Sequence, residues 1–505
     1  MKRALNFLKR HHIKILTAAV IALIIALRFI NLDADTVAVQ PIHNQDEGNY
    51  SQNARNFVAG HHWINDETNF FLLSPVFSFL QLPFLAIFGV HFWTFRAVNA
   101  VASLLTILIG YLFLKDIAGK KAAIIFTLLL GLNFLYLVHN RIAIPETTQG
   151  LFLLGAVVSF FYASLRQNPW LFFLAGIFST LAFLTKASAV VIFAVIAISF
   201  LGNVAKTFLQ DRHISLANLS QLLALPIACY MLGVASLLAA YHAFMVRPHA
   251  ALYQIAKQNL IDLNAPQLHN LRDLTYLKEL AVSFWQGGEA NVWIYFPIPL
   301  IFCVWFVAKF SKKYLQNRET LLETILVVWL LVGLADFFIV GYKPARFFVV
   351  YLIPISMITA LLLTNLKTRL QILFLAFIII TNGFLITKFI LLDTHFSLRD
   401  ASNHLENTVG NHTVAGDNLI HLDNSRSRVY NYYFSQLVRD RPFDLALYLK
   451  DHSYPDFLLI GTNDVMLHAE LQSLGSYQKV ETIKTNTYFP TPRQIDLYQK
   501  LPPAP

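Results

Sequence analysis

Long apolar runs that recur almost to the end of the chain constrain its fold more than any other feature. Many of them reach the roughly 17 to 25 residues that a membrane-spanning helix needs. Only 13% of the 505 residues are charged, which is about half the share found in soluble globular domains. We predict a mostly α, polytopic transmembrane helical bundle, because helices satisfy their own backbone hydrogen bonds in lipid. The runs lie at 15–30, 70–90, 95–114, 122–138, 150–165, 171–184, 190–201, 222–244, 292–307, 325–340, 347–363 and 370–392.

The net charge of +10 bears on the class of partner. A basic chain can bind nucleic acid, but here Lys and Arg lie mainly in short loops between apolar runs, where they orient a membrane protein. We therefore expect membrane lipids, and no nucleic acid, as partners. Cys229 and Cys303 each lie inside an apolar run, so neither indicates a disulfide or a metal cluster.

The basic loops also decide which runs cross the membrane. If every run crossed, the loops 115–121, 309–318 and 365–369 would all face outward, against the preference of short basic loops for the cytoplasm. Pro75 and Pro83 within the run 70–90 favour broken or in-plane helices there. Without that run about eleven crossings remain, the N-terminus is cytoplasmic and the C-terminus is outside.

Beyond residue 392 the composition turns polar, which divides the chain into two parts. We predict a transmembrane module at 1–392, with a first outer loop at 32–94 that holds juxtamembrane helices, and a small extracytoplasmic α/β domain at 393–505. Alternation and turn residues predict its elements. These are strands at 413–422, 455–461, 477–485 and 493–501, and helices at 425–437 and 465–474.

The first outer loop carries the sequence "QDEGNYSQNARNFVAG" at 45–60, which predicts an amphipathic helix. Glu47, Ser51 and Arg55 fall at i, i+4 and i+8, on one face. Asp46 lies in the first turn, where the helix dipole favours a carboxylate. Asp46 and Glu47 are therefore either catalytic groups or simple helix caps, and the helix pattern alone does not separate these readings.

Three other polar stretches share the predicted outer face: "HNRIAIPE" at 139–146, "LTKAS" at 184–188 and "GYKPARFFVVYLIP" at 341–354. Together with the acidic pair they suit transfer of a sugar from a lipid-linked phosphate. Such a site needs a carboxylate to hold or deprotonate the acceptor and cations to stabilise the departing phosphate. Asp46 and Glu47 supply the first requirement. The candidate cations are Arg141, Lys186, Lys343 and Arg346.

Each cation has a structural alternative. Lys186 could extend to the membrane interface instead of lining an aqueous cavity, although intramembrane charges are usually functional. Lys343 and Arg346 could be helix-end anchors; their outward placement favours phosphate binding. Arg141 and Glu146 could form an ion pair with each other.

These residues resemble the GT-C membrane glycosyltransferases, in particular the dolichyl-phosphate-mannose protein mannosyltransferase superfamily and bacterial relatives such as the lipid A aminoarabinose transferases. The first loop resembles the family's Asp-Glu loop, "NRIAIPE" its second acidic motif, "FLTKAS" its Leu-Thr-Lys-Gly turn and "KPARFFVVYLIP" its late basic-aromatic-Leu-Pro motif. The resemblance runs in order from residue 22 to about residue 365, and the bacterial branch is closer because no repeat-rich domain interrupts the loops.

The resemblance implies residue roles. Asp46 would be the acid–base carboxylate, Glu47 its neighbour and Glu146 the second acidic group. The residues near the donor phosphate would be Lys186, Arg346 and Tyr351, with Lys343 and Arg141 as further candidates and with Arg55 and Tyr50 in support. The sequence departs from the family at His61 and His62, at Ser74-Pro75 where the bacterial motif has Lys-Pro, and at Ala187. Lys343 could replace the missing lysine.

The implied function is transfer of a sugar, with inversion, from a polyprenyl-phosphate donor to a lipid A, glycan or protein acceptor at the outer face of the inner (plasma) membrane. No cofactor is certain; a divalent metal is kept as an alternative, although no His and carboxylate spacing requires one. The rival function is a transporter or flippase of lipid-linked sugar, since intramembrane cations can also line a pathway. Against it, no inverted repeat is recognisable. A non-catalytic scaffold is a third class, which the intact Asp-Glu pair disfavours.

Overall fold

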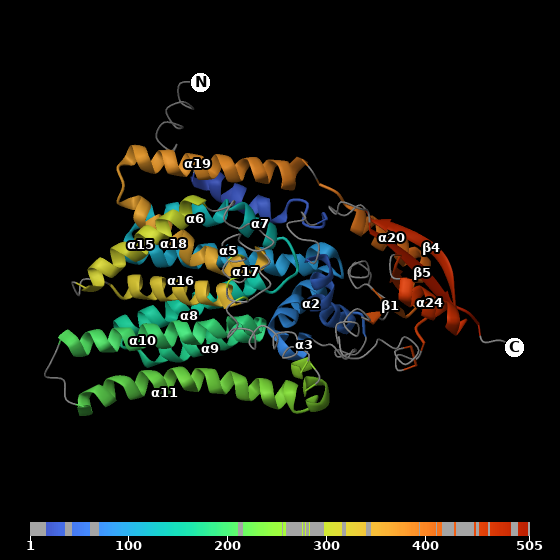
Figure 1. The fold of residues 1–505 in the computed structure, drawn as a ribbon, viewed down its shortest axis with the longest axis horizontal. Helices are drawn as coiled ribbons and strands as arrows, with labels where there is room; N and C mark the ends of the chain where they lie inside the picture. Colours follow the sequence, from blue (N-terminus) through green and yellow to red (C-terminus); the bar gives the residue numbers. More distant parts are fainter. Residues whose placement is uncertain are drawn as a thin grey trace, which may run out of the picture.

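The structure is a computed structural model that describes residues 17–35, 43–60, 70–210, 216–254, 256–258, 275, 278, 282, 297–315, 320–339, 345–392, 394–410, 412–416, 429–430, 449–450, 454–462, 465–485 and 493–502. Most of these residues form a helical bundle, and a small sheet with its own helices lies at one end of it (Figure 1). The predicted mostly α bundle with a small C-terminal α/β unit is confirmed.

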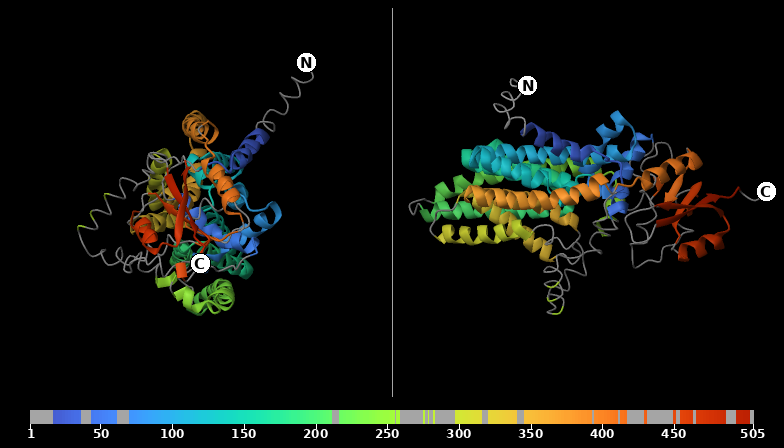
Figure 2. Two further views of the ribbon diagram at one scale, coloured as in Figure 1. Left: turned by 90° about the vertical axis from the view of Figure 1, so that its right-hand side faces the viewer. Right: turned by 90° about the horizontal axis from the view of Figure 1, so that it is seen from above.

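The bundle helices run roughly side by side along the long axis, and Figure 2 shows the same arrangement from two further sides. Within the described residues, six helices are long and apolar enough to cross a membrane, and shorter apolar helices accompany them. The chain is a multi-pass membrane protein, for which about eleven crossings stay a prediction. The bundle consists of the helix Thr17–Phe29, α5 (Phe92–Ala118), α6 (Lys120–Gly131), α7 (Phe134–His139), α8 (Glu146–Arg166), α9 (Pro169–Thr185), α10 (Val191–Gln210), α11 (Leu216–Tyr241), α15 (Pro297–Leu315), α16 (Leu321–Ile339), α18 (Leu352–Thr364) and α19 (Thr368–Ile386).

One predicted run, 122–138, is divided into α6 and α7. The Asn133 side chain accepts a hydrogen bond from the Tyr136 backbone N–H at 2.8 Å and so caps α7. The Asn382 side chain accepts the Phe134 N–H at 2.8 Å from α19. Because asparagine oxygens satisfy backbone donors that a helix start leaves unpaired, the break is stable inside an otherwise apolar run.

The first outer loop contains α2 (His43–Val58), α3 (Phe70–Leu73) and α4 (Pro75–Phe88). The predicted helix at 45–60 is confirmed as α2. The predicted break in the run 70–90 is also confirmed, since α3 and α4 are separated at Ser74 and Pro75 occupies the start of α4, where its missing N–H is harmless. Figure 1 shows α2 and α3 between the bundle and the sheet.

The C-terminal unit is built on a five-stranded sheet, in the order β2-β1-β3-β5-β4 within the described residues. β1 pairs in parallel with β2 and β3, whereas β5 pairs antiparallel with β3 and β4. The elements are α20 (Ser397–Val409), β1 (Val414–Gly416), β2 (Val429–Tyr430), β3 (Phe457–Gly461), α24 (Val465–Leu474), β4 (Tyr477–Thr485) and β5 (Arg493–Lys500).

The prediction for 425–437 was wrong at its described residues. A helix was expected there, but Val429 and Tyr430 form an edge strand beside β1. A β-branched and an aromatic residue favour a strand once a neighbouring strand is present to pair with. The structure does not describe the other residues of 425–437. It also does not describe the part of the predicted strand 413–422 that follows Gly416. The remaining four predicted elements are confirmed.

The C-terminal unit is attached to the bundle by polar caps and by an apolar cluster. The Asp35 carboxylate accepts hydrogen bonds from the Ser397 N–H, the Ser397 hydroxyl and the Leu398 N–H at 2.6 to 3.0 Å, and so caps α20 from 362 residues away. Arg399 pairs with Asp33 at 2.9 Å. The apolar cluster includes Ala54, Phe77, Phe95, Leu405 and Leu497. The unit therefore packs on α2, α4 and α5.

Helices α9 and α11 approach closely through a pair of glycines. A Cβ added at Gly176 would lie 2.2 Å from the Tyr230 carbonyl oxygen, and one added at Gly233 would lie 2.2 Å from the Phe173 carbonyl oxygen. Because both obstructions are backbone atoms, neither can move aside alone. Small residues that allow backbones to meet are a recurrent means of helix association in membranes.

We expect Gly176→Ala to force α9 and α11 apart and to destabilise the protein by ~1–3 kcal/mol, the usual penalty for overpacking. The midpoint of thermal unfolding in detergent measures this effect. Gly383→Ala is the matched control, because nothing lies within 4 Å of a Cβ at that helical position, and it should leave the midpoint unchanged or raise it. Equal midpoints for the two variants would contradict the close-contact interpretation.

Candidate active site

The start of α2 is held by a buried ion pair between Glu47 and Arg96 of α5. Arg96 donates from Nε to one Glu47 carboxylate oxygen and from Nη2 to the other, both at 2.8 Å. The Ala143 backbone N–H also donates to Glu47 at 2.6 Å. The two side chains are only 1% and 2% exposed. A bidentate, fully buried pair of this kind fixes both partners in one geometry.

The same arginine also holds the chain that follows the first helix. Arg96 Nη1 donates to the carbonyl oxygens of Leu32 and Ala34 at 3.0 and 2.6 Å. The Glu47–Arg96 pair therefore fastens α2, the loop at Ala143 and the segment that leads to Asp35 at one point. Because the Glu47 carboxylate is occupied by these donors, the geometry favours positioning of α2 over proton transfer as its role.

The loop between α7 and α8 is fixed from the next turn of α5. The Asn99 amide donates to the Ile142 and Ile144 carbonyl oxygens at 2.6 and 2.5 Å, and Thr148 donates to Asn99 at 2.7 Å. This places Glu146 in the first turn of α8, where the helix dipole favours a carboxylate.

Arg96 and Asn99 were not among the residues predicted for the site. They belong to a polar stripe on α5 that continues with Ser103 and Thr106, all fully or almost fully buried. Their spacing of three or four residues within an otherwise apolar segment is the pattern that could have revealed them, because neighbours at this spacing share a helix face. Ser103, in the same stripe, accepts a hydrogen bond from Arg28 Nε at 2.8 Å.

Glu146 brings together two of the four predicted cations, Lys186 and Arg346. It forms an ion pair with Lys186, and its carboxylate lies 3.6 Å from Arg346 Nε. Lys186 lies at the junction between α9 and the short 3-10 helix Ala187–Val190, where the chain is extended. Arg346 belongs to α17 (Ala345–Phe348). Three segments distant in sequence thus converge on one buried cluster, which we call the Glu146 cluster: Glu146, Lys186 and Arg346.

The cations of the Glu146 cluster share an aromatic surface. Lys186 Nζ lies 4.6 Å from the centre of the Phe347 ring and the Arg346 guanidinium carbon lies 5.4 Å from it. The side chains of Lys186 and Arg346 are 14% and 11% exposed, whereas that of Glu146 is 1% exposed. Desolvation strengthens electrostatic attraction, so cations that are largely buried but still reachable suit the binding of an anion.

Tyr50 places α2 close to the Glu146 cluster. Burial, and secondarily the charge of Glu146, raise the pKa of the Tyr50 phenol well above its ordinary value, so the hydroxyl stays neutral. Tyr50 packs edge-on against Phe77, and its carbonyl accepts from Ser78 at 2.8 Å. Asp46 lies one turn earlier in α2. The Asp46 side chain lies outside the described residues, as does Lys343.

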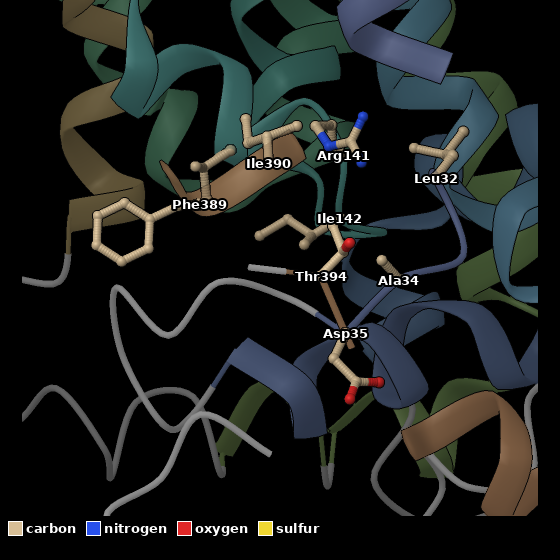
Figure 3. Close-up of a pocket in the computed structure, with 9 residues that line it drawn as sticks. Leu32, Ala34, Asp35, Arg141, Ile142, Phe389, Ile390 and Thr394 are labelled. Atoms are coloured by element: carbon tan, nitrogen blue, oxygen red, sulfur yellow. The ribbon is translucent and has the colours of Figure 1, made fainter. Parts of the chain in front are cut away.

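Arg141 is occupied elsewhere. It donates to the carbonyl oxygens of Leu27 and Asn31 at 2.7 and 2.8 Å and so satisfies the end of the first helix. The sequence left open an ion pair between Arg141 and Glu146. In the structure Glu146 pairs with Lys186 and Arg346 instead. Figure 3 shows Arg141 on the wall of a small pocket with Asp35, Ile142 and Phe389, beside the segment that follows the first helix.

Two further predicted residues have partners outside the Glu146 cluster. The Tyr351 hydroxyl donates to Asp336 of α16 at 2.9 Å. Arg55 is fully buried and donates to Asn56 at 3.0 Å; burial lowers the pKa of its guanidinium to about 9, and Glu406 of α20 partly opposes this. Among the residues that the structure describes, no group of three or more His, Cys, Asp or Glu side chains is arranged to hold a metal ion.

Comparison with known proteins agrees with this architecture. Residues 73–230 match the model of a family described as dolichyl-phosphate-mannose-protein mannosyltransferase. An uncharacterized protein of Aquifex aeolicus (strain VF5) is 34% identical over 104 residues, and this match covers 20% of the chain and 21% of that relative.

Solved structures match over nearly the whole chain. ArnT from Cupriavidus metallidurans in the apo state has a TM-score of 0.60 at 13% identity, covering 96% of this chain and 98% of ArnT. The oligosaccharyltransferase of Archaeoglobus fulgidus has a TM-score of 0.55 at 14% identity, covering 98% and 75%. The chain therefore has the GT-C fold of these glycosyltransferases, and the resemblance predicted from the motifs is confirmed.

We expect Arg96→Met to destabilise the protein by ~3–5 kcal/mol, because it leaves the buried Glu47 carboxylate without its charged partner. Thermal unfolding in detergent measures the loss, and adding Glu47→Gln to Arg96→Met should recover part of it.

The control for this prediction is Lys313→Met. Lys313 pairs with Glu323 at 2.5 Å, but both side chains are partly exposed, and exposed pairs contribute only ~0–1 kcal/mol. An Arg96→Met variant as stable as Lys313→Met would show that the buried pair does not fasten the loops.

Proposed function

We propose that the protein is an integral membrane glycosyltransferase that moves a sugar from a polyprenyl-phosphate donor to an acceptor, with inversion, at the outer face of the membrane. The observation that carries this proposal is the Glu146 cluster, in which largely buried Lys186 and Arg346 contact Glu146. The charge of Glu146 acts in turn on Tyr50 of α2, the helix that carries Asp46. The family match over residues 73–230 and the ArnT structure bound to undecaprenyl phosphate support it.

Lys186 and Arg346 bind the donor phosphate in this proposal. A phosphate leaving group needs no proton, but its developing charge needs fixed cations in a site that excludes water. Arg346 can offer a planar pair of N–H donors, whereas Lys186 acts as a compact charge on a flexible stem. Lys343, three residues before Arg346, extends the same basic stretch.

Asp46 acts as the base. It takes the proton of the acceptor hydroxyl or amine as that nucleophile attacks the anomeric carbon of the donor sugar. The bond between the anomeric carbon and the phosphate oxygen breaks, and its electron pair leaves with polyprenyl phosphate. A single displacement from the opposite face inverts the anomeric configuration. Glu47, held by Arg96, keeps the start of α2 in place for this step.

The orientation follows from the basic loops. The basic stretches 115–121, 309–315 and 365–369 lie at the α5–α6 junction, the end of α15 and the α18–α19 junction, at the end of the bundle away from α2 and the sheet (Figure 1). Short basic loops favour the cytoplasm, so the Glu146 cluster and the C-terminal unit face outward from the inner membrane. The acceptor is a lipid such as lipid A, a glycan or a protein; the archaeal oligosaccharyltransferase structure is tethered with an acceptor peptide.

One assay distinguishes the proposed transferase from the rival function, a transporter or flippase of lipid-linked sugar. Purified protein is given labelled polyprenyl-phosphate sugar in the presence of candidate acceptors. A transferase releases polyprenyl phosphate and labels the acceptor, whereas a flippase leaves the lipid intact. A chelator and added divalent metal form separate arms, since the archaeal oligosaccharyltransferase is also known in a complex with Zn and sulfate.

We expect Asp46→Asn to abolish sugar transfer while leaving the protein level and donor binding largely intact, because an amide cannot accept the acceptor's proton. Transfer of labelled sugar, with donor binding measured in parallel, tests this. Asp116→Asn is the control: Asp116 accepts from Tyr162 at 2.6 Å near the far end of α5 and should keep full transfer. Full transfer by Asp46→Asn would refute the assignment of Asp46.

We expect Arg346→Ala to weaken donor binding by ~1.5–3 kcal/mol, the usual contribution of a hydrogen bond to a charged group. This corresponds to a roughly ten- to hundredfold rise in Kd. The control is Arg166→Ala, since Arg166 lies over the Tyr162 ring at the other end of α8. Unchanged donor affinity in Arg346→Ala would remove Arg346 from the site.

A further inference from the structure

We propose that Glu146 is an internal occupant of the phosphate subsite, so that its carboxylate and the lipid phosphate compete for Lys186 and Arg346. This inference rests on the proposed function and deepens it. It makes Glu146 a residue that sets the affinity for the lipid phosphate and the ease with which polyprenyl phosphate leaves. In the alternative role, Glu146 supports phosphate binding by holding Lys186 in place. That role predicts the opposite change in affinity for the lipid phosphate when the Glu146 carboxylate is removed.

The contacts motivate competition. The Glu146 carboxylate is 1% exposed and lies against both cations that the donor phosphate requires. A carboxylate and a phosphate both present anionic oxygens to lysine and arginine, and both form charge-assisted bonds with them. A phosphate that enters between Lys186 and Arg346 must therefore take over contacts that Glu146 makes in the ligand-free protein.

The charges of the two lipid ligands point the same way. A sugar phosphodiester brings one negative charge, and the polyprenyl phosphate product, a monoester, brings about −1.5 to −2. Like charges held close together in a buried site repel one another, so the competition with Glu146 is stronger for the product than for the donor.

The backbone of Glu146 keeps the competitor at hand. The first turn of α8 is fixed through the bonds of Asn99 to Ile142, Ile144 and Thr148. The carboxylate can turn away from Lys186 but cannot move off with its helix. After transfer it returns to the cations and helps to displace polyprenyl phosphate, so the site discharges its product without an external anion.

The test measures the binding and dissociation of undecaprenyl phosphate by full-length protein in detergent, for wild type and for Glu146→Gln. Glutamine keeps the shape and removes the charge, so we expect Kd to fall about tenfold or more, mainly through slower dissociation. Glu323→Gln is the matched control, because it removes a carboxylate that pairs with Lys313 at 2.5 Å outside the site. It should leave Kd unchanged.

Each outcome is decisive. If wild type binds and Glu146→Gln binds with equal or weaker affinity, competition is overturned and the proposed function stands. If neither protein binds the lipid phosphate, the proposed function falls and the inference falls with it. If Glu146→Gln does not fold, Glu146→Asp replaces it. Its shorter carboxylate withdraws from Lys186, so a two- to threefold tightening is expected, and equal or weaker binding overturns the inference.

Discussion

The buried pair of Glu47 and Arg96 is the interaction on which the site end of the molecule depends. Removing two charges from water costs several kcal/mol for each ion, and their attraction offsets this only when the geometry is good and the remaining donors are satisfied. Arg96 meets that condition with a bidentate contact to Glu47 and two backbone carbonyl bonds, and Glu47 accepts a further bond from Ala143. Segments that would otherwise be separate loops are fixed to α5 at one place.

The consequences extend in both directions from α5. Toward the sheet, the segment held at Leu32 and Ala34 continues to Asp35, which caps α20 and so determines where the C-terminal unit begins. Toward the bundle, the loop held at Ala143 and by Asn99 determines where α8 starts and where Glu146 lies. The polar stripe of α5 therefore positions both α2, which carries the proposed base, and Glu146, which lies against the proposed phosphate-binding cations.

Local patterns predicted most of the fold. Apolar runs located the bundle helices, and strand alternation located β3, β4 and β5. Pro75 located the break at Ser74, whereas Pro83, the other proline of that run, lies inside α4. What local patterns could not supply is contact over long sequence separations. The division of α6 from α7 depends on Asn382, 248 residues from Phe134, and the short strand β2 exists because β1 lies beside it. Likewise the motifs predicted Lys186 and Arg346 near the donor phosphate, but not that Glu146 contacts both of them. They also offered Arg141 for that site, whereas Arg141 satisfies the end of the first helix.

The two ends of the candidate site differ in how far their charged side chains are exposed, and the difference fits their proposed tasks. At α2 the carboxylate of Glu47 is saturated by Arg96 and Ala143, which suits a part that must hold a base within reach of the anomeric carbon. At the Glu146 cluster, Lys186 and Arg346 lie against one buried carboxylate and keep more exposure than it does. Without Glu146, both cations would lose this buried carboxylate in the ligand-free protein. In the proposed function, the carboxylate balances charge until the donor binds, and the exposure of the cations lets the donor phosphate reach them, which is the compromise expected where electrostatic preorganisation must precede the ligand.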